Sequence, residues 1–322
     1  MHAAILDAFT TDQGSDCWSG IRSLIDALEV HPRTPLTDTV ARSAGRQILL
    51  TNKARITAEH LAALPDLRYI GVMATGTNVI DLAEAKARGV VVTNVPGYST
   101  ASVAQLVWSL VLHLTTDVAG HDAEVKAGRW AAGPDFCFFR QPLIELAGKT
   151  LVVIGSGEIG RATARIGEAF GMRVVAAAVP GSSTPGRTPL AEALAQADII
   201  TLHCPLTPAT TGLVSREFLA ALKPSALVIN TGRGPLIDNQ ALVEALAAGR
   251  LGGVALDVLP VEPPPSSDPL LTALAAKPAW ARRVAITPHI AWGTVEARAR
   301  LVHEVELNLA AFLNGIERNR VA

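Results

Sequence analysis

The sequence predicts an α/β protein with two Rossmann-like domains, each a doubly wound parallel sheet, and with the smaller domain discontinuous in the chain. Short strand-like apolar runs alternate with helix-like runs along most of the 322 residues, as in parallel sheets covered by helices on both faces. A glycine-rich turn joins one such strand to one such helix near residue 155. The length fits about two domains.

The glycine-rich turn reads LVVIGSGEIG over 151–160. A GxGxxG between a buried-type strand and an amphipathic helix is typical of a turn that binds the pyrophosphate of a dinucleotide. Gly155 allows the tight turn, Gly157 lets the phosphates approach the backbone, and Gly160 lets helix and strand pack closely. The free N–H groups at the helix start then face the anion.

The alternation places both domains along the chain. In the first half we expect strands at 3–8, 47–50, 69–74 and 90–94, and helices at 18–29, 57–63 and 80–88. In the second half we expect strands at 151–154, 173–179, 198–205, 226–232, 252–258 and 284–290, and helices at 161–172, 189–196, 215–222 and 239–248. A closing helix is expected at 294–313.

We expect domain boundaries near residues 99 and 288. Residues 1–98 and 289–322 then form a substrate-binding domain, and residues 99–288 form a dinucleotide-binding domain, with ligands between them. The mostly apolar helix at 100–118 lies at the first boundary. It is expected either in the core or at an inter-domain or subunit contact, and the sequence favours neither.

Composition excludes several classes of function. Apolar residues make up 49% of the chain, charged residues 18%, and the net charge is −1, which argues against nucleic-acid and anionic membrane partners. The apolar run at 103–114 is shorter than the roughly 20 residues of a membrane span. Three distant cysteines, Cys17, Cys137 and Cys204, form no disulfide framework and no zinc pattern. We therefore expect no metal, no signal peptide and a cytoplasmic location.

Three residues at predicted strand ends suggest chemistry: Arg233, Glu262 and His289. Each alone is more often an ordinary loop or core residue, but the carboxyl ends of parallel strands meet at the ligand crevice. A guanidinium grips the carboxylate of a 2-oxo acid with two hydrogen bonds. An imidazole donates a proton to the carbonyl oxygen as hydride arrives, and a carboxylate behind it fixes its tautomer.

Motifs spread over nearly the whole chain make it resemble the D-isomer-specific 2-hydroxyacid dehydrogenases, and within them the glycerate dehydrogenase and hydroxypyruvate reductase group. The motifs are TNK at 51, ATGTNVID at 74, NVPGYSTASVAQ at 94, DFCF at 135, PLIELAGKTLVVIGSGEIG at 142, HCPLT at 203, NTGRGPLID at 230, ALDVL at 255, EPPP at 262 and TPHIAW at 287. The resemblance implies NAD(P)H-dependent reduction of a small 2-oxo acid, of the hydroxypyruvate or glyoxylate type, to the D-2-hydroxy acid, and the reverse oxidation.

The resemblance also implies roles for individual residues. Arg233, Glu262 and His289 correspond to the catalytic trio, and the backbone of Thr75 and Gly76 corresponds to the donors that hold the substrate carboxylate. Trp292 fits the hydroxypyruvate-reducing branch, or simply packs. The residues expected at the cofactor are Gly155, Gly157, Glu158, Ile159, Gly160, Ser182, Pro205, Thr210, Thr231 and Asp257, the last orienting the nicotinamide amide. A homodimer through helix 100–118 is implied as well.

One departure concerns the cofactor, NAD(H) or NADP(H). An acidic residue normally ends the second strand of such a domain and binds the adenosine ribose. Ala178 stands there instead, and no Asp or Glu lies within 172–186. Because nothing repels a 2′-phosphate, and Ser182, Ser183 and Arg187 lie close by in the sequence, we expect NADPH to be accepted at least comparably to NADH.

Other functions stay open at this point. The substrate could be glyoxylate, a branched or aromatic 2-oxo acid, or phosphite, whereas formate is disfavoured because formate-oxidising relatives replace the acid at the Glu262 position. Outside enzymes, the family includes dinucleotide-sensing transcriptional corepressors that keep the trio. The sequence shows none of the basic or disordered tails expected of such an interaction protein.

Overall fold

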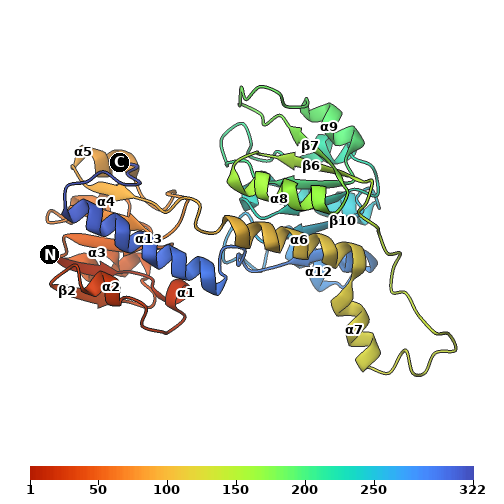
Figure 1. Cartoon of the computed structure of the whole chain (residues 1–322), viewed down its shortest axis with the longest axis horizontal. Helices are drawn as coiled ribbons and strands as arrows, with labels where there is room; N and C mark the ends of the chain where they lie inside the picture. Colours follow the sequence, from red (N-terminus) through yellow and green to blue (C-terminus); the bar gives the residue numbers. More distant parts are fainter. The chain divides into compact units, whose positions relative to one another are not determined.

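The computed structural model describes all residues, 1–322, and divides the chain into two compact units. Unit 1 contains Met1–Ser99 and Trp292–Ala322, and unit 2 contains Thr100–Ala291. Each unit holds its own parallel sheet (Figure 1), so the predicted fold class is confirmed. The division after Ala291 places His289 in the same unit as Arg233 and Glu262.

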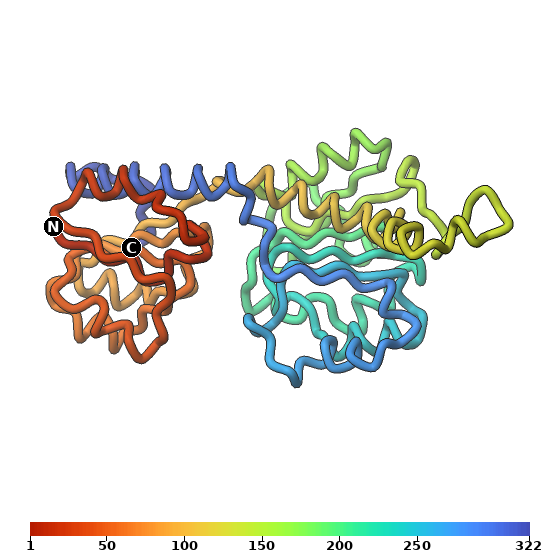
Figure 2. The backbone as a smooth tube through the Cα atoms, turned by 90° about the horizontal axis from the view of Figure 1, so that it is seen from below, coloured from red at the N-terminus to blue at the C-terminus, as the bar shows by residue number.

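Unit 1 is a five-stranded parallel sheet in the order β2-β1-β3-β4-β5. Its strands are β1 His2–Ile5, β2 Ala27–Val30, β3 Ile48–Thr51, β4 Tyr69–Val72 and β5 Val91–Thr93. Its helices are α1 Phe9–Asp12, α2 Ser19–Arg22, α3 Thr39–Ser43, α4 Ala58–Ala62, α5 Leu82–Ala87 and α13 Val295–Leu313, with a 3-10 turn η1 at Leu36–Asp38. The apolar stripe of α13, which includes Leu301 and Leu309, completes the core on one face of this sheet (Figure 2).

Unit 2 is a six-stranded parallel sheet in the order β11-β10-β9-β8-β6-β7. Its strands are β6 Thr150–Ile154, β7 Arg173–Ala177, β8 Ile199–Leu202, β9 Leu227–Asn230, β10 Gly253–Leu256 and β11 Val284–Ile286. Its helices are α6 Thr100–Thr116, α7 Val118–Lys126, α8 Glu158–Ala169, α9 Leu190–Gln196, α10 Arg216–Ala220, α11 Asn239–Ala247 and α12 Pro269–Ala275, with 3-10 turns η2 Gly234–Leu236 and η3 Ala279–Arg283.

Helices cover both faces of the unit 2 sheet, as its buried strands require. One face carries α6 and α8 (Figure 1), whose side chains share a core with β6, β9 and β10. The other face carries the helices from α9 to α12. The long apolar helix is therefore a core helix of this unit, with Val107 and Val111 fully buried.

The predicted helix at 18–29 is wrong. Only Ser19–Arg22 is helical, and Ala27–Val30 forms strand β2, which pairs in parallel with β1. Helical spacing is followed by four apolar residues, Ile21, Leu24, Ile25 and Leu28. However, the edge of β1 offers unpaired backbone N–H and C=O groups, and residues 27–30 satisfy them by forming a strand. In that strand Leu28 and Val30 still pack on the core, so tertiary pairing overrides the local pattern.

The single helix expected at 100–118 is instead two. Asp117 adopts a left-handed conformation with φ 47°, and its side chain accepts a hydrogen bond from the N–H of Gly120 at the start of α7. No single helix of the structure is long and apolar enough to cross a membrane; α6 and α7 meet that test only when combined across a 56° bend.

Candidate active site

The predicted trio follows three adjacent strands of unit 2. Arg233 comes after β9, Glu262 after β10 and His289 after β11. These strands pair in parallel in the order β11-β10-β9, so their carboxyl ends open on one edge of the sheet, where ligands bind in such folds. Sheet topology thus places at one edge of the sheet residues that are 29 and 27 positions apart in the chain.

Glu262 and His289 are in direct contact. The imidazole Nδ1 lies 2.5 Å from Glu262 Oε2, and Glu262 Oε1 accepts a hydrogen bond of 3.0 Å from the N–H of Leu259. Both carboxylate oxygens are therefore fixed. Because Nδ1 is engaged, Nε2 is the ring nitrogen left to exchange a proton with a ligand. The side chains of His289 and Glu262 are 25% and 34% exposed, so a ligand can reach them.

The backbone of His289 is held in an unusual shape. Its φ is 54°, a left-handed conformation that costs a non-glycine residue about 1–3 kcal/mol. Its N–H donates to the carbonyl of Asp257 at 2.8 Å. The Asp257 side chain then accepts hydrogen bonds from the N–H groups of Ile290 and Ala291, both 2.9 Å, and from the Thr287 hydroxyl at 2.6 Å.

Asp257 is therefore the anchor of the His289 segment. The residue is 1% exposed, and burial raises the pKa of its carboxyl while the hydrogen bonds oppose that rise. Both oxygens already accept hydrogen bonds inside unit 2. The contact with the nicotinamide amide stays a prediction, and the supporting role was not visible in the sequence because it depends on how β10 and β11 pair.

Arg233 offers an uncompensated positive charge. Its carbonyl accepts the Asn230 side-chain N–H at 2.9 Å, which fixes its backbone. Its guanidinium donates only to the carbonyl of Gly232, at 2.8 Å, and forms no ion pair. No hydrogen bond joins it to Glu262 or His289. A half-buried cation without a carboxylate partner is suited to bind the anionic group of a ligand.

The three glycines of the turn meet three different requirements. Gly155 has φ 101°, and a Cβ there would lie 2.4 Å from the N atom of Cys204. A Cβ at Gly160 would lie 2.0 Å from the carbonyl oxygen of Gly155, whereas one at Gly157 would meet nothing within 4 Å. The space beside Gly157 is thus open to a ligand, while the other two glycines are needed for packing.

The start of α8 presents backbone donors. Its N-cap is Gly157, which provides no side-chain cap, and the N–H groups of Gly157, Glu158 and Ile159 donate no hydrogen bond within the protein. Free N–H groups at a helix start, beside an open glycine, form the cradle that a pyrophosphate requires. The residues present therefore fit a dinucleotide.

Comparisons with known proteins agree with this geometry. Residues 108–291 match the family described as "D-isomer specific 2-hydroxyacid dehydrogenase, NAD binding domain". The chain is 39% identical to a hydroxypyruvate reductase of Blautia hydrogenotrophica over 100% of this chain and 99% of that one. It is 38% identical to a glycerate dehydrogenase of Methylorubrum extorquens over 88% of each chain.

A solved structure of a protein from Thermus thermophilus matches over 100% of both chains, with 34% identity and a TM-score of 0.83. The chain belongs to the D-isomer specific 2-hydroxyacid dehydrogenase family. The resemblance inferred from the motifs is thereby confirmed. A nicotinamide dinucleotide is the cofactor for which the family's domain is named.

Of the residues expected to contact the cofactor after β8, Thr210 already forms hydrogen bonds within the protein. The Thr210 hydroxyl is buried and lies 2.7 Å from the carbonyl oxygen of Pro205, while the N–H of Thr207 donates to it at 2.8 Å. Thr210 therefore braces the loop that carries Pro205. The hydroxyl of Thr231, after β9, is buried without a partner and is the polar group here that a ligand could satisfy.

His203 is a second histidine close to the glycine turn. Its backbone packs against Gly155, and burial lowers the pKa of its imidazole to about 4. It is therefore neutral near pH 7 and is not suited to donate a proton. His289, which is paired with a carboxylate, is the histidine suited to that role.

The expected substrate-side residues lie in unit 1. Thr75 and Gly76 follow β4, and their N–H groups donate no hydrogen bond within the protein. The Trp292 ring packs edge-on against Tyr98, with ring centroids 6.5 Å apart. Trp292 thus takes part in packing within unit 1, and its contact with substrate stays a prediction.

The glycine geometry generates a test. Gly157→Ala lowers the free energy of unfolding by no more than about 1 kcal/mol, the cost of an alanine N-cap, since the added methyl meets no protein atom, but weakens NAD(P)H binding about tenfold, or 1.4 kcal/mol. Gly160→Ala lowers the free energy of unfolding by about 1–3 kcal/mol because its methyl overlaps the Gly155 carbonyl. Urea unfolding and fluorescence titration with NAD(P)H measure both. Unchanged cofactor affinity in Gly157→Ala would contradict the assignment of the cradle.

Proposed function

We propose that the protein reduces a small 2-oxo acid of the hydroxypyruvate or glyoxylate type to the D-2-hydroxy acid with NAD(P)H, and catalyses the reverse oxidation. The observation that carries this proposal is the contact of 2.5 Å between His289 and Glu262 at the sheet edge that also carries Arg233. The match to a hydroxypyruvate reductase and a glycerate dehydrogenase supports the substrate class.

Each residue has a separate task. Bound dinucleotide supplies the hydride. Arg233 holds the substrate carboxylate and polarises the carbonyl, and the N–H groups of Thr75 and Gly76 bind the same carboxylate. His289 donates a proton from Nε2 to the carbonyl oxygen as negative charge develops there. Glu262 orients the imidazole and stabilises its charged form.

The test of this proposal is a cofactor-oxidation assay that follows NAD(P)H absorbance with hydroxypyruvate, glyoxylate, bulkier 2-oxo acids and phosphite. We expect turnover of the two small 2-oxo acids and the D-product. His289→Gln is expected to lose at least about 1000-fold in kcat with cofactor affinity retained, because only the proton donor is removed. Arg233→Ala is expected to raise KM and lower kcat.

Two results would reject the proposal. Tight cofactor binding without turnover of any acid would favour a dinucleotide-sensing protein, and near wild-type turnover in His289→Gln would remove the assigned acid. A matched control is His303→Gln, because His303 is exposed on α13 in unit 1 and has no role in the mechanism.

We further propose that NADPH is used at least as well as NADH. Ala178 follows β7 without a carboxylate, and its N–H donates to the carbonyl of Thr188 at 2.8 Å. The loop between them carries the exposed hydroxyls of Ser182 and Ser183 and the half-buried Arg187. A hydroxyl-rich loop with one cation and no acid is suited to a 2′-phosphate.

For this proposal, kcat/KM is measured with each cofactor. Arg187→Ala is expected to lower kcat/KM for NADPH about tenfold more than for NADH, since a charge-assisted hydrogen bond of about 1.5 kcal/mol is lost. The control is Arg250→Ala, at an exposed position, which should leave kcat/KM unchanged for both NADPH and NADH. A wild-type preference for NADH above roughly a hundredfold, about 2.7 kcal/mol, would reject the proposal.

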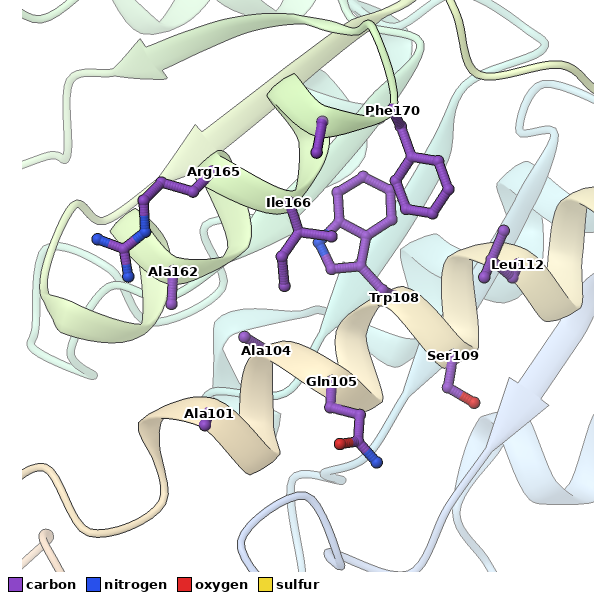
Figure 3. Close-up of a pocket in the computed structure, with 11 residues that line it drawn as sticks. Ala101, Ala104, Gln105, Trp108, Ser109, Leu112, Ala162, Arg165, Ile166 and Phe170 are labelled. Carbon is purple, nitrogen blue, oxygen red and sulfur yellow. The ribbon is translucent and has the colours of Figure 1, made fainter.

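A homodimer through α6 is the third proposal. An apolar groove of about 820 Å³ runs between α6 and α8. Figure 3 shows the Trp108 ring of α6 beside Ile166 and Phe170 of the α8 segment, with Gln105 and Ser109 on the opposite flank of α6. Such a groove offers apolar surface that a second copy of the chain could cover, which supports a contact through α6.

The segment after α7 supports the same proposal. The loop that follows α7 projects from the rest of unit 2 (Figure 2), and Arg140 ties the end of this loop to Asp117 at 2.7 Å and to Glu124 at 3.0 Å. Phe136 is 89% exposed and Phe139 is 63% exposed. An ordered arm that holds aromatic side chains in solvent fits a second copy of the chain better than a monomer.

Light scattering after size exclusion tests the dimer. Wild type is expected at twice the 33.7 kDa chain mass. Ser109→Arg, at an exposed position on the groove, is expected to shift the protein to monomer. Ser266→Arg, on an exposed loop of the same unit, should leave the mass unchanged. A wild-type monomer at micromolar concentration, or a dimeric Ser109→Arg, would contradict the proposal.

A further inference from the structure

We propose that Asp7 is a positioning residue for the substrate: its carboxylate shapes the loop at 51–54 and, through that loop, the Thr75–Gly76 segment. This inference rests on the proposed function, which assigns the substrate carboxylate to Thr75 and Gly76. Asp7 lies just beyond β1, far in sequence from that segment, and none of the catalytic roles given above involves it.

The Asp7 carboxylate accepts hydrogen bonds from three backbone N–H groups and lies beside one hydroxyl. Its Oδ1 accepts the N–H of Asn52 at 2.8 Å, and its Oδ2 accepts the N–H groups of Lys53 at 2.5 Å and Ala54 at 2.9 Å. The Thr51 hydroxyl lies 3.2 Å from Oδ1. Burial raises the pKa of Asp7, and these donors oppose the rise. Asp7 is half-buried, and a carboxylate that loses part of its hydration is tolerated where donors surround it, so carboxylate and loop fix each other.

The loop is tied to the next strand by two further hydrogen bonds. The N–H of Met73 donates to the carbonyl of Thr51 at 2.7 Å, and the Asn52 side chain donates to the carbonyl of Met73 at 2.6 Å. Asn52 is 2% exposed. Because this side chain is enclosed, a shift of the loop moves Met73, which lies two residues before Thr75.

The Thr75–Gly76 segment is held from its other side by the chain after β5. The Asn94 side chain donates to the carbonyl of Thr75 at 2.7 Å. The Thr75 hydroxyl donates to the carbonyl of Val95 at 2.9 Å, and the N–H of Val95 donates to the carbonyl of Ala74 at 3.0 Å. The backbone N–H groups of Thr75 and Gly76 are left for a ligand, and their position depends on both neighbouring loops.

Asp7→Asn is a sharp test because it keeps the shape of the side chain. Three backbone N–H groups point at the two oxygens of Asp7. An NH₂ group at the Oδ2 position leaves the N–H groups of Lys53 and Ala54 facing another donor, and one at the Oδ1 position does the same to the N–H of Asn52, while the Thr51 hydroxyl can turn to the carbonyl of Ala54 at 3.0 Å. The matched control is Asp81→Asn in the same unit, because Asp81 accepts one backbone N–H, from Glu84 at 3.0 Å, and an amide oxygen can still accept it.

Steady-state kinetics with hydroxypyruvate give the first readout. Asp7→Asn is expected to raise KM about tenfold while kcat changes less than about threefold, since ground-state and transition-state binding of the carboxylate weaken together. The dissociation constant of NAD(P)H, which binds unit 2, is expected to stay unchanged. Asp81→Asn should match wild type in KM, in kcat and in the dissociation constant of NAD(P)H. Unchanged KM in Asp7→Asn would overturn the proposal.

Hydrogen exchange gives a readout that needs no activity. In Asp7→Asn we expect faster exchange in peptides covering 51–54 and 73–76, with the rest of unit 1 as in wild type. Faster exchange over the whole of unit 1 would show general destabilisation and overturn the positioning role. If wild type turns over no 2-oxo acid, the proposed function fails, yet the exchange pattern still decides whether Asp7 controls the two loops.

Discussion

The hydrogen bond between Glu262 and His289 is the interaction on which the site depends, and it exists because a buried carboxylate elsewhere fixes the backbone. The left-handed conformation of His289 is unfavourable by itself. Hydrogen bonds from the 287–291 segment to Asp257 hold it in place. Without that anchor, nothing in the local sequence would keep Nδ1 of His289 against Glu262 and leave Nε2 for a ligand.

The two units carry different kinds of groups for the proposed chemistry. Unit 2 carries the guanidinium, the imidazole with its carboxylate, and the free N–H groups of the glycine turn. Unit 1 carries neutral backbone donors at Thr75 and Gly76. In the proposed function, an anionic substrate would find one full positive charge on unit 2 and neutral dipoles on unit 1. In this proposal, the negative charge that develops on the substrate carbonyl oxygen is stabilised by His289 and Arg233, and the His289 imidazole is already oriented by Glu262.

Most of the strands and the main candidate site residues could be predicted from the sequence. Parallel sheets bury nearly continuous apolar runs, and glycine turns have strict steric requirements. The positions of all strands except β2, the role of Gly157 as against Gly160, and the location of Arg233, Glu262 and His289 at strand ends all follow from such local patterns. The error at 18–29 arose where helical spacing competed with an open sheet edge, which local spacing does not report.

The supporting residues could not be predicted, because their partners are distant in the chain. Asp257 acts on residues about 30 positions away, and Asp7 acts on a loop about 45 positions away. A lone aspartate after a strand looks the same whether it is solvated or buried under several donors. The sequence likewise does not indicate that the Thr210 hydroxyl forms a hydrogen bond with the Pro205 carbonyl of its own loop.

The most direct test of the account is a crystal structure of the protein with NADH and oxamate, an unreactive analogue of a 2-oxo acid. The account predicts that the amide oxygen of oxamate, in place of the reacting carbonyl, lies within hydrogen-bond distance of His289 Nε2. It also predicts that the carboxylate contacts the Arg233 guanidinium and the N–H groups of Thr75 and Gly76. Oxamate bound away from His289, or with its carboxylate on other groups, would contradict it.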